Sequence, residues 1–320
     1  MKFYMAPMEG ITGYIFRNSY QTCFGGMEKY FSPFLAAHSQ REFHPRELQD
    51  VLPEHNRGIP LIPQILTNRA DDFLLAVRKM QDLGYQEVNL NLGCPSKTVV
   101  SKGRGAGFLE DPLVLDRFFD AIFEKTEIKI SVKTRLGMEF PSEFEDLLAV
   151  YNKYPIEELI VHPRLQCDYY NGSPRKEYYE YALHHSRIPV CYNGDICTAE
   201  DYRALRAAYP QTKIIMMGRG ILQNPFLPLE IRGMRRPDKE KLRQFHDLIF
   251  TGYQDVMSGE RPVLFKMKEL WQYMICLFAD AEKYAKKIRK TQRLSDYIAI
   301  VDELFQKLTL KQLISPTGGQ

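Results

Sequence analysis

The chain has 320 residues, of which 44% are hydrophobic and 26% are charged, values that are ordinary for a soluble globular protein. No apolar run approaches the ~18 residues that a membrane span needs. The opening MKFYMAPMEG also lacks the apolar stretch of a secretory signal. We therefore expect a cytoplasmic protein with no membrane segment.

The cysteines predict reduced thiols rather than a metal centre. They form no CxxC pair and no Cys/His cluster with the spacing of zinc ligands. In the cytosol such thiols stay reduced, and a small buried hydrophobe is the default role of each. We expect that role for five of the six, Cys94 being the exception, and we expect no bound metal.

The net charge of +3 is spread unevenly along the chain. Residues 232–320 hold 17 Lys and Arg against 11 Asp and Glu, a balance of +6, whereas residues 1–231 carry −3. A basic end on a mildly acidic body is typical of proteins with a polyanionic partner. A charge run is more often a solvated helix face, so the charges alone leave both interpretations open.

Short apolar runs separated by amphipathic stretches predict a (β/α)8 TIM barrel. Several runs are continuously apolar, as parallel strands buried on both faces are. Their ends lie 25 to 42 residues apart, the length of one βα unit. A doubly wound open sheet is the alternative, but the Gly-rich first turn of that fold is absent. The eight runs cover residues 3–8, 28–32, 59–65, 87–93, 128–135, 158–164, 188–195 and 213–220.

Helices are expected between these runs and after them. Residues 69–84, 111–125 and 198–209 have helical periodicity, with Asp111 and Thr198 as N-caps and Gly84 as a stop. Beyond residue 232 no strand pattern recurs, and periodic stretches cover residues 239–257, 262–278 and 295–308. We therefore expect a catalytic barrel over residues 1–231 and an all-helical domain over residues 232–320.

Polar residues end most of the expected strands, where barrel enzymes carry their active sites. Burying a polar side chain at the end of an apolar run costs folding free energy unless the side chain is hydrogen-bonded or binds a ligand. They are Gln64, Asn89, Asn91, Lys133, His162, Arg164, Asn193-Gly194-Asp195 and Gly218-Arg219-Gly220.

The last two of these groups predict a phosphate site. Loops after the seventh and eighth strands bind phosphate in many barrels. The backbone at Gly218 and Gly220 has no Cβ to keep an anion away, and Arg219 adds a charged donor. A helix-starting turn without a ligand is the alternative.

Two further residues, Cys94 and Lys133, could take part in a reaction. Cys94 lies between Gly93 and Pro95, which predicts a turn that presents its thiol into the barrel mouth, and Lys97 or Lys102 could tune its pKa. Lys133 could face the N1–C2=O edge of a flavin or pair with a carboxylate such as Asp195.

His162 could hold a flavin edge or the phosphate side of the cofactor, or be a satisfied polar group. Its motif and the others together resemble one enzyme family, the tRNA-dihydrouridine synthases, and most closely its bacterial C-type branch. The resembling segments follow the family's order across most of residues 1–226. They are APMEG (6–10), Gln64, NLNLGCPSK (89–97), GAGFL (105–109), VKTRLG (132–137), VHPR (161–164), NGDI (193–196) and GRG (218–220). HPRL stands at residues 162–165 where that family usually has HGRT.

The resemblance implies FMN at the barrel mouth, NADPH or NADH as electron donor, and tRNA as partner of a monomeric enzyme. Hydride would reach C6 of a uridine, and Cys94 would protonate C5. Asn91 and Arg164 would contact the substrate, and the helical domain would bind tRNA. The implied cofactor-binding residues are Pro7, Met8, Glu9, Gln64, Lys133, His162, Asn193, Gly194, Asp195, Gly218 and Arg219.

Two other functions remain open. A small-molecule FMN oxidoreductase similar to dihydroorotate dehydrogenase would also use barrel-mouth Lys, Asn and Cys residues, but it does not require a basic helical domain. A non-catalytic RNA-binding barrel would bind no flavin and would be indifferent to Cys94→Ala.

Overall fold

The computed structural model describes residues 1–38, 43–234 and 238–311. The chain forms two compact units, the first comprising residues 1–18 and 26–218, and the second residues 19–25 and 219–320. Among the described helices none is both long and apolar enough to cross a bilayer.

The first unit is built on one parallel sheet, and every strand pair in it is parallel. Nine of the ten strands overlap the eight runs expected from the sequence, the run at residues 59–65 being divided between β4 and β5, whereas β3 lies beyond the run at residues 28–32. The strands are β1 (Lys2–Met5), β2 (Lys29–Phe31), β3 (Leu35–Ala36), β4 (Leu61–Ile62), β5 (Gln64–Leu66), β6 (Glu87–Leu92), β7 (Lys129–Thr134), β8 (Leu159–Val161), β9 (Val190–Asn193) and β10 (Ile214–Met217).

The order of the strands shows that the sheet is a closed barrel. It runs β3-β5-β6-β7-β8-β9-β10-β1-β2-β4. β2 and β3 are consecutive parts of one chain segment, and β4 and β5 are consecutive parts of the next. β2 pairs with β4, and β3 pairs with β5. The two segments therefore lie side by side along their length, which joins the two ends of the sheet. This closure confirms the (β/α)8 prediction and excludes the open sheet.

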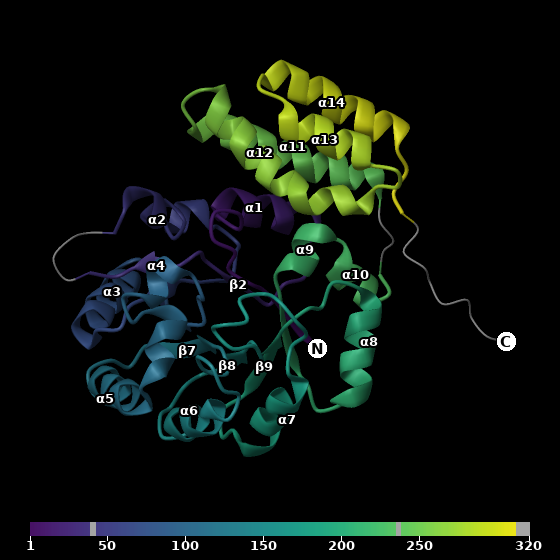
Figure 1. Ribbon diagram of the computed structural model, residues 1–320. Helices are drawn as coiled ribbons and strands as arrows, with labels where there is room; N and C mark the ends of the chain where they lie inside the picture. The colour runs from purple at the N-terminus through teal and green to yellow at the C-terminus, as the bar shows by residue number, and fades with distance from the viewer. Residues whose placement is uncertain (39–42, 235–237, 312–320) are drawn as a thin grey trace. The chain divides into compact units, whose positions relative to one another are not determined.

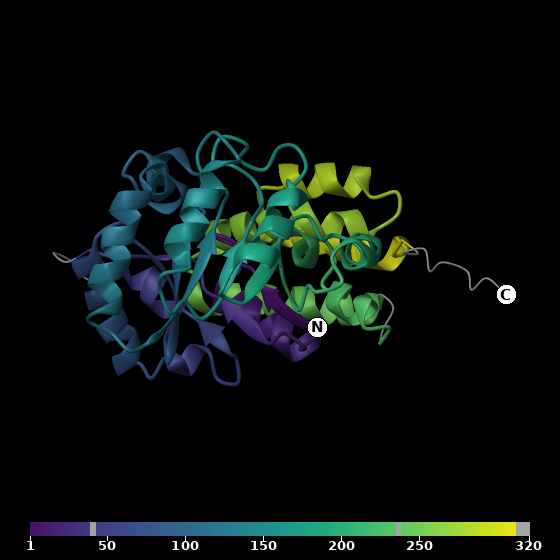
Figure 2. The ribbon, with the colours of Figure 1, turned by 90° about the horizontal axis from the view of Figure 1, so that it is seen from below.

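Helices cover the outside of these strands (Figures 1 and 2). The three helices expected between strands are present as α3, α5 and α8. Asp111 caps α5 by accepting bonds from the amides of Leu113 and Val114, and Thr198 forms a capping box with Asp201 at α8. The helices that begin in this unit are α1 (Tyr14–Cys23), α2 (Pro45–Gln49), α3 (Ala70–Asp82), α4 (Lys97–Val100), α5 (Pro112–Phe123), α6 (Glu143–Tyr151), α7 (Lys176–His185) and α8 (Ala199–Ala208), with 3-10 turns η1 (Pro53–His55) and η2 (Gly105–Glu110).

The described part of the second unit is helical. Helices α11, α12 and α14 occupy the three expected stretches, whereas α9, α10 and α13 were not expected from the periodicity. Its elements are α9 (Arg219–Gln223), α10 (Leu227–Ile231), α11 (Lys239–Val256), α12 (Glu260–Met274), η3 (Ile275–Leu277), α13 (Glu282–Lys290) and α14 (Leu294–Lys307). Residues 19–25, the end of α1 and the turn after it, also belong here, because the Phe24 ring packs edge-on against those of Phe226 and Phe245, with centroids 4.9 and 5.2 Å away.

A directional chain of hydrogen bonds crosses the core of the second unit. The indole Nε1 of Trp271 donates to the Tyr297 hydroxyl over 2.8 Å. That hydroxyl lies 2.6 Å from Nε2 of His246, whose Nδ1 is 2.8 Å from an Asp247 carboxylate oxygen. An ionised carboxylate can only accept, so a neutral His246 donates to Asp247 through Nδ1 and accepts from the Tyr297 hydroxyl through Nε2. Burial lowers the pKa of His246, which is consistent with this neutral form.

Candidate active site at the barrel mouth

The carboxyl ends of parallel barrel strands meet at one rim, called the mouth here. Most of the predicted site residues of the first unit lie near this rim, in the last two positions of a strand or in the loop that follows, whereas Gln64 opens β5 and Asn89 lies in the middle of β6. Arg219 is the first residue of α9 and belongs to the second unit. Its predicted contact with a cofactor stays a prediction.

A row of buried amides runs along the inside of β5 and β6. The Asn91 amide nitrogen donates to Oε1 of Gln64 over 2.8 Å, and Nε2 of Gln64 donates to the Asn89 oxygen over 2.8 Å. Asn89 in turn donates to the Ser131 hydroxyl over 3.0 Å. The cost of burying these polar groups is offset because each has a partner. The row fixes the rotamers of Gln64 and Asn91 relative to one another.

The Asn91 side chain also shapes the turn that carries Cys94. Its Oδ1 accepts hydrogen bonds from the backbone amides of Gly93 and Cys94, both at 3.0 Å. The Cys94 carbonyl accepts from the Ala106 amide at 3.0 Å. A Cβ at Gly105 would lie 2.8 Å from that carbonyl oxygen, so only glycine fits there. Asn91 thus holds the turn that presents the thiol, in addition to any contact with a substrate.

Two side chains from the neighbouring strands support the same turn. Nε of Arg135, which is 1% exposed, donates to the Gly93 carbonyl over 2.9 Å. Nε2 of Gln166 donates to the Pro95 carbonyl over 3.2 Å. Neither Arg135 nor Gln166 was singled out from the sequence. The VKTR motif contains Arg135, but nothing in the motif reveals which backbone it contacts.

The surroundings of Cys94 keep it a thiol. Burial raises its pKa above the ordinary value of 9.0, and the positive charges of Lys133 and Arg135 only partly oppose that effect. The cations that act on the thiol are these two rather than Lys97 or Lys102. A part-buried cysteine with a raised pKa is a poor nucleophile at neutral pH but retains a proton to donate.

Lys133 supplies a cation to the mouth. The described residues provide no hydrogen bond or ion pair to its ammonium group. The alternative partner, Asp195, pairs with Arg164 instead. Burial lowers the Lys133 pKa to about 8. A desolvated, unpaired ammonium group is costly in a folded protein, which favours a site built for an electronegative ligand atom.

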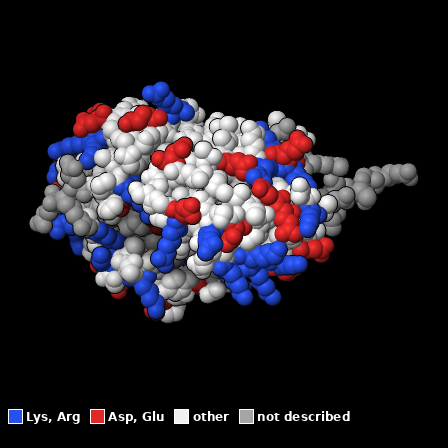
Figure 3. Space-filling view, turned by 90° about the horizontal axis from the view of Figure 1, so that it is seen from above, with Lys and Arg blue, Asp and Glu red and all other residues white. Residues whose placement is uncertain are grey.

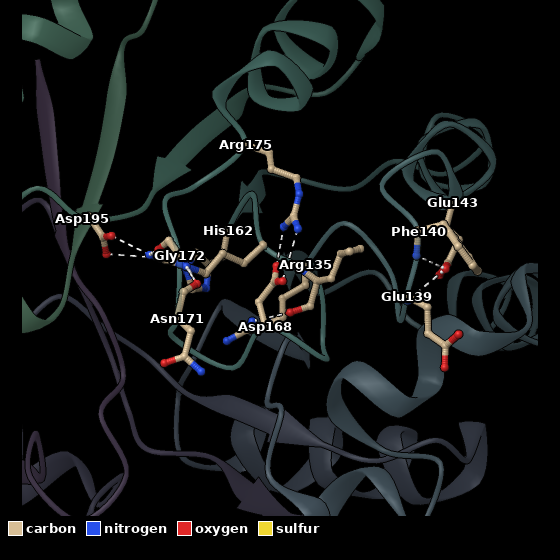
Figure 4. Close-up of polar contacts among 12 residues, drawn as sticks. Arg135, Glu139, Phe140, Glu143, His162, Asp168, Asn171, Gly172, Arg175 and Asp195 are labelled. Carbon is tan, nitrogen blue, oxygen red and sulfur yellow. Dashed lines mark hydrogen bonds and ion pairs between the residues drawn. The ribbon is translucent and has the colours of Figure 1, made fainter.

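Arg164 and its partners form a rigid group at the end of β8 (Figure 4). The guanidinium is 1% exposed and contacts both carboxylate oxygens of Asp195, at 2.5 and 3.2 Å. It also donates to Nε2 of His162 over 3.0 Å and to the Asn171 carbonyl over 3.2 Å. A guanidinium with so many of its donors engaged positions its neighbours, so the predicted substrate contact of Arg164 gains no support from this geometry.

The remaining predicted residues lie on the ends of β9, β10 and β1. Asn193 donates to the Met216 carbonyl over 2.9 Å, which ties the end of β9 to β10. Gly194 is buried, Pro7 and Met8 are half-buried, and Glu9 is exposed. A Cβ at Gly218 would lie 3.2 Å from the Met8 sulfur, so close packing alone accounts for this glycine. The predicted phosphate site there stays a prediction.

The described residues hold no cluster of three or more His, Cys, Asp or Glu side chains suited to a metal ion. The positive charges of Lys133 and Arg135 act on the Cys94 thiol. A protonated thiol, a rigid turn that carries it and a nearby positive charge suit the addition of hydride and a proton to an electron-poor double bond.

Comparison of the sequence with known proteins places the chain in a family. Residues 4–309 match the dihydrouridine synthase (Dus) family. A "Probable tRNA-dihydrouridine synthase" of Rickettsia typhi is 27% identical over 260 residues, 79% of this chain and 78% of that protein. A "tRNA-dihydrouridine(16) synthase" of Cupriavidus necator is 28% identical over 240 residues, 73% of this chain and 74% of that protein.

Solved structures agree on the fold. The old yellow enzyme homologue from Zymomonas mobilis has a TM-score of 0.53 at 12% identity, covering 76% of this chain and 92% of its own. Histamine dehydrogenase from Rhizobium sp. 4-9 has a TM-score of 0.56 at 12% identity, covering 79% of this chain and 48% of its own. The fold of the first unit, the thiol held at its mouth and the match across nearly the whole sequence lead to one conclusion: this chain belongs to the dihydrouridine synthase family.

Proposed function

We propose that the protein reduces specific uridines of tRNA to 5,6-dihydrouridine, with FMN as cofactor and NADPH as electron donor. The observation that carries this proposal is the pairing of a protonated Cys94, on a turn held by Asn91, with the Lys133 cation at the same mouth. The family's reaction adds one hydride and one proton across the C5–C6 bond of uracil, so it needs a proton donor of this kind.

The residues at the mouth fit a flavin. Lys133 offers an ammonium group without a partner among the described residues, and the electronegative N1–C2=O edge of an isoalloxazine is a suitable one. Gln64 makes one bond at each end of its amide, to Asn89 and from Asn91, which leaves one donor and one acceptor site. When bound, the flavin supplies the hydride that adds to C6 of uracil, with NADPH as the source of its electrons.

The chain's own residues would complete the reaction at C5. Addition at C6 leaves enolate character at C5 and O4, and the Cys94 thiol gives its proton to C5. Since burial raises the thiol pKa, the proton is present at neutral pH. Asn91, Arg135 and the Gly105 turn hold the sulfur in place, so little reorganisation is needed when the proton moves.

A polyanionic substrate agrees with the surface of the second unit. Exposed basic residues lie on α13 and just after it. Figure 3 shows one face of the molecule on which Lys and Arg side chains gather among carboxylates. Binding through such charges weakens as salt rises. The exposed basic residues are Lys283, Lys286, Arg289, Lys290 and Arg293.

The test is to incubate the purified protein with FMN, NADPH and undermodified tRNA and to count dihydrouridine by mass spectrometry. Cys94→Ala should lower the rate of dihydrouridine formation by about 10²- to 10⁴-fold while leaving flavin reduction by NADPH intact. Cys167→Ala, which removes an exposed thiol, is the matched control and should be neutral. A flavoprotein that oxidises NADPH but leaves tRNA unchanged would instead indicate a small-molecule oxidoreductase. A protein that binds no flavin would refute both.

A further inference from the structure

The turn that follows β8 brings Arg164 back onto the ring of His162. The His162 amide donates to the Thr134 carbonyl over 2.9 Å, which fixes this residue to the end of β7. The Arg164 amide donates to the His162 carbonyl over 2.7 Å, a bond that encloses a γ-turn with Pro163 at its centre. A proline ring holds φ near about −65°, close to the value of about −75° in an inverse γ-turn, so the turn is short and stiff.

The guanidinium of Arg164 uses all five of its N–H donors on groups of the protein (Figure 4). Nε donates to the Asn171 carbonyl over 3.2 Å, and Nη2 donates to the Gly172 carbonyl and to Asp195, both over 2.5 Å. Nη1 donates to the other Asp195 oxygen over 3.2 Å and to Nε2 of His162 over 3.0 Å. Arg164 is 1% exposed, so water is a poor substitute for any of these acceptors.

The contact between Arg164 and His162 determines which ring nitrogen of the histidine carries a proton. A guanidinium can only donate, so Nε2 of His162 must accept and must therefore hold a lone pair. A doubly protonated ring would turn N–H toward N–H and would bring two positive charges together at a side chain that is 7% exposed. The ring is therefore neutral with its proton on Nδ1, and that nitrogen is a donor.

We propose that Arg164, itself held by Asp195, is a positioning residue that keeps His162 in this form, so that Nδ1–H donates to an acceptor atom of the bound flavin. The link to the flavin rests on the proposed function, whereas the form of the ring follows from the hydrogen bonds alone. A flavin offers such acceptors in the carbonyl oxygens of its ring and the oxygens of its phosphate. A donor that is already fixed adds to affinity, because no tautomer has to be selected when the cofactor binds.

The form of the ring is measurable without turnover, by NMR at neutral pH of protein labelled with nitrogen-15 at histidine. Long-range proton–nitrogen correlations separate a ring nitrogen with a lone pair from one with a proton. The signals of His162 are those that vanish in His162→Asn. The wild type should show Nδ1 protonated and Nε2 unprotonated, and an Nε2–H ring or a doubly protonated ring would overturn the proposal.

Variants of Arg164 test whether this residue sets the form of the ring. Arg164→Lys keeps a side chain that can only donate, so the wild-type pattern should persist. Arg164→Gln supplies an amide that can donate or accept, so an Nε2–H population should appear. Arg175→Gln is the matched control, because it removes an ion pair with Asp168 from the same loop and should leave the ring unchanged. An unchanged ring in Arg164→Gln would overturn the role of Arg164.

Flavin affinity tests the use of the donor. The amide nitrogen of an asparagine replaces Nδ1 of a histidine in its number of bonds from the backbone, whereas that of a glutamine replaces Nε2. His162→Gln should therefore weaken FMN binding, followed by flavin fluorescence, about 5- to 30-fold, the effect of one lost hydrogen bond, while His162→Asn should stay within about threefold of the wild type. Unchanged affinity in His162→Gln, or equal losses in the two variants, would overturn the donor.

Riboflavin, which lacks the phosphate, locates the acceptor atom. A similar loss of riboflavin affinity in His162→Gln supports a donor to the ring, and a loss for FMN alone supports a donor to the phosphate. If the protein forms no dihydrouridine, the proposed function fails, while the NMR and binding measurements still decide the role of Arg164 and His162.

Discussion

Replacement of Asn91 by alanine gives the sharpest test of how the reactive turn is held. The change removes two acceptor bonds, to the amides of Gly93 and Cys94, and one donor bond, to Gln64. At about 1 kcal/mol for each bond, we expect a loss of about 3 kcal/mol of folding free energy. About 1–2 kcal/mol of that is local to the two amides, so their opening becomes about 5- to 30-fold more frequent.

Hydrogen–deuterium exchange measured by mass spectrometry on peptides that cover residues 89–97 reads this opening directly. Asn91→Asp keeps the oxygen that accepts from both amides but loses the donor to Gln64, so it should retain their protection. Asn152→Ala is the matched control, because it also removes a donor bond and an acceptor bond, to His185 and from Arg187, at a half-buried position away from the Cys94 turn. Unchanged exchange at residues 93 and 94 in Asn91→Ala would refute the reasoning and assign the turn to Arg135 and the backbone alone.

The remaining predictions concern a glycine, a thiol and a histidine. In urea unfolding, both Gly137→Ala and Gly58→Ala should lower the free energy of unfolding by about 1–3 kcal/mol, because both glycines have a positive φ. Gly137→Ala should lower it further, because its Cβ would clash with Glu143 whereas Gly58 has open space around it. Equal losses in the two variants would exclude the clash. Alkylation of Cys94 by iodoacetamide, followed by peptide mapping, should be slow at neutral pH and should accelerate only above the ordinary thiol pKa of 9.0. Lys133→Met should move that rise to higher pH, because it removes a charge that lowers the thiol pKa, whereas Lys97→Met should leave it in place. Since the pKa of His246 is lowered in the folded state, the unfolded chain binds more protons below about pH 6.5, so the second unit should lose stability as pH falls through that value. His246→Gln should flatten the dependence of its Tm on pH, and a steep dependence in that variant would show that another group is responsible.

The sequence predicts the barrel because buried parallel strands have a plain signature. Each of the eight apolar runs contains a strand, and the expected caps Asp111 and Thr198 both cap helices. β3 lies beyond the run at residues 28–32 and was not expected, because a strand of two residues is too short to show a period. The interruption between β4 and β5 is not visible in the pattern, because both strands begin within one apolar run. Pro63 lies between β4 and β5, where it cannot donate a ladder hydrogen bond.

The site is predictable as a set of positions but not as a set of contacts. The residue types at the strand ends pointed to Cys94 and Lys133, but three partnerships were not predicted: one is a side-chain contact within a turn, and two join residues that are far apart in the sequence. Asp195 pairs with Arg164 rather than Lys133, Asn91 holds the Cys94 turn, and Arg135 contacts that turn from the next strand. Long-range pairings of this kind leave no trace in local periodicity. The same holds for residues 19–25, whose aromatic partners lie about 200 positions away.

The hydrogen-bond chain in the second unit also gives the protein a built-in optical reporter. Trp271 is the only tryptophan of the chain, it is 2% exposed, and its ring centroid lies 5.6 Å from that of His246. A protonated imidazole at that range quenches indole emission by accepting an electron, whereas a neutral one does so weakly. Indole emission, excited at wavelengths that the tyrosines do not absorb, therefore reports on the surroundings of Trp271 in the second unit, and it falls when His246 takes up a proton, without any label.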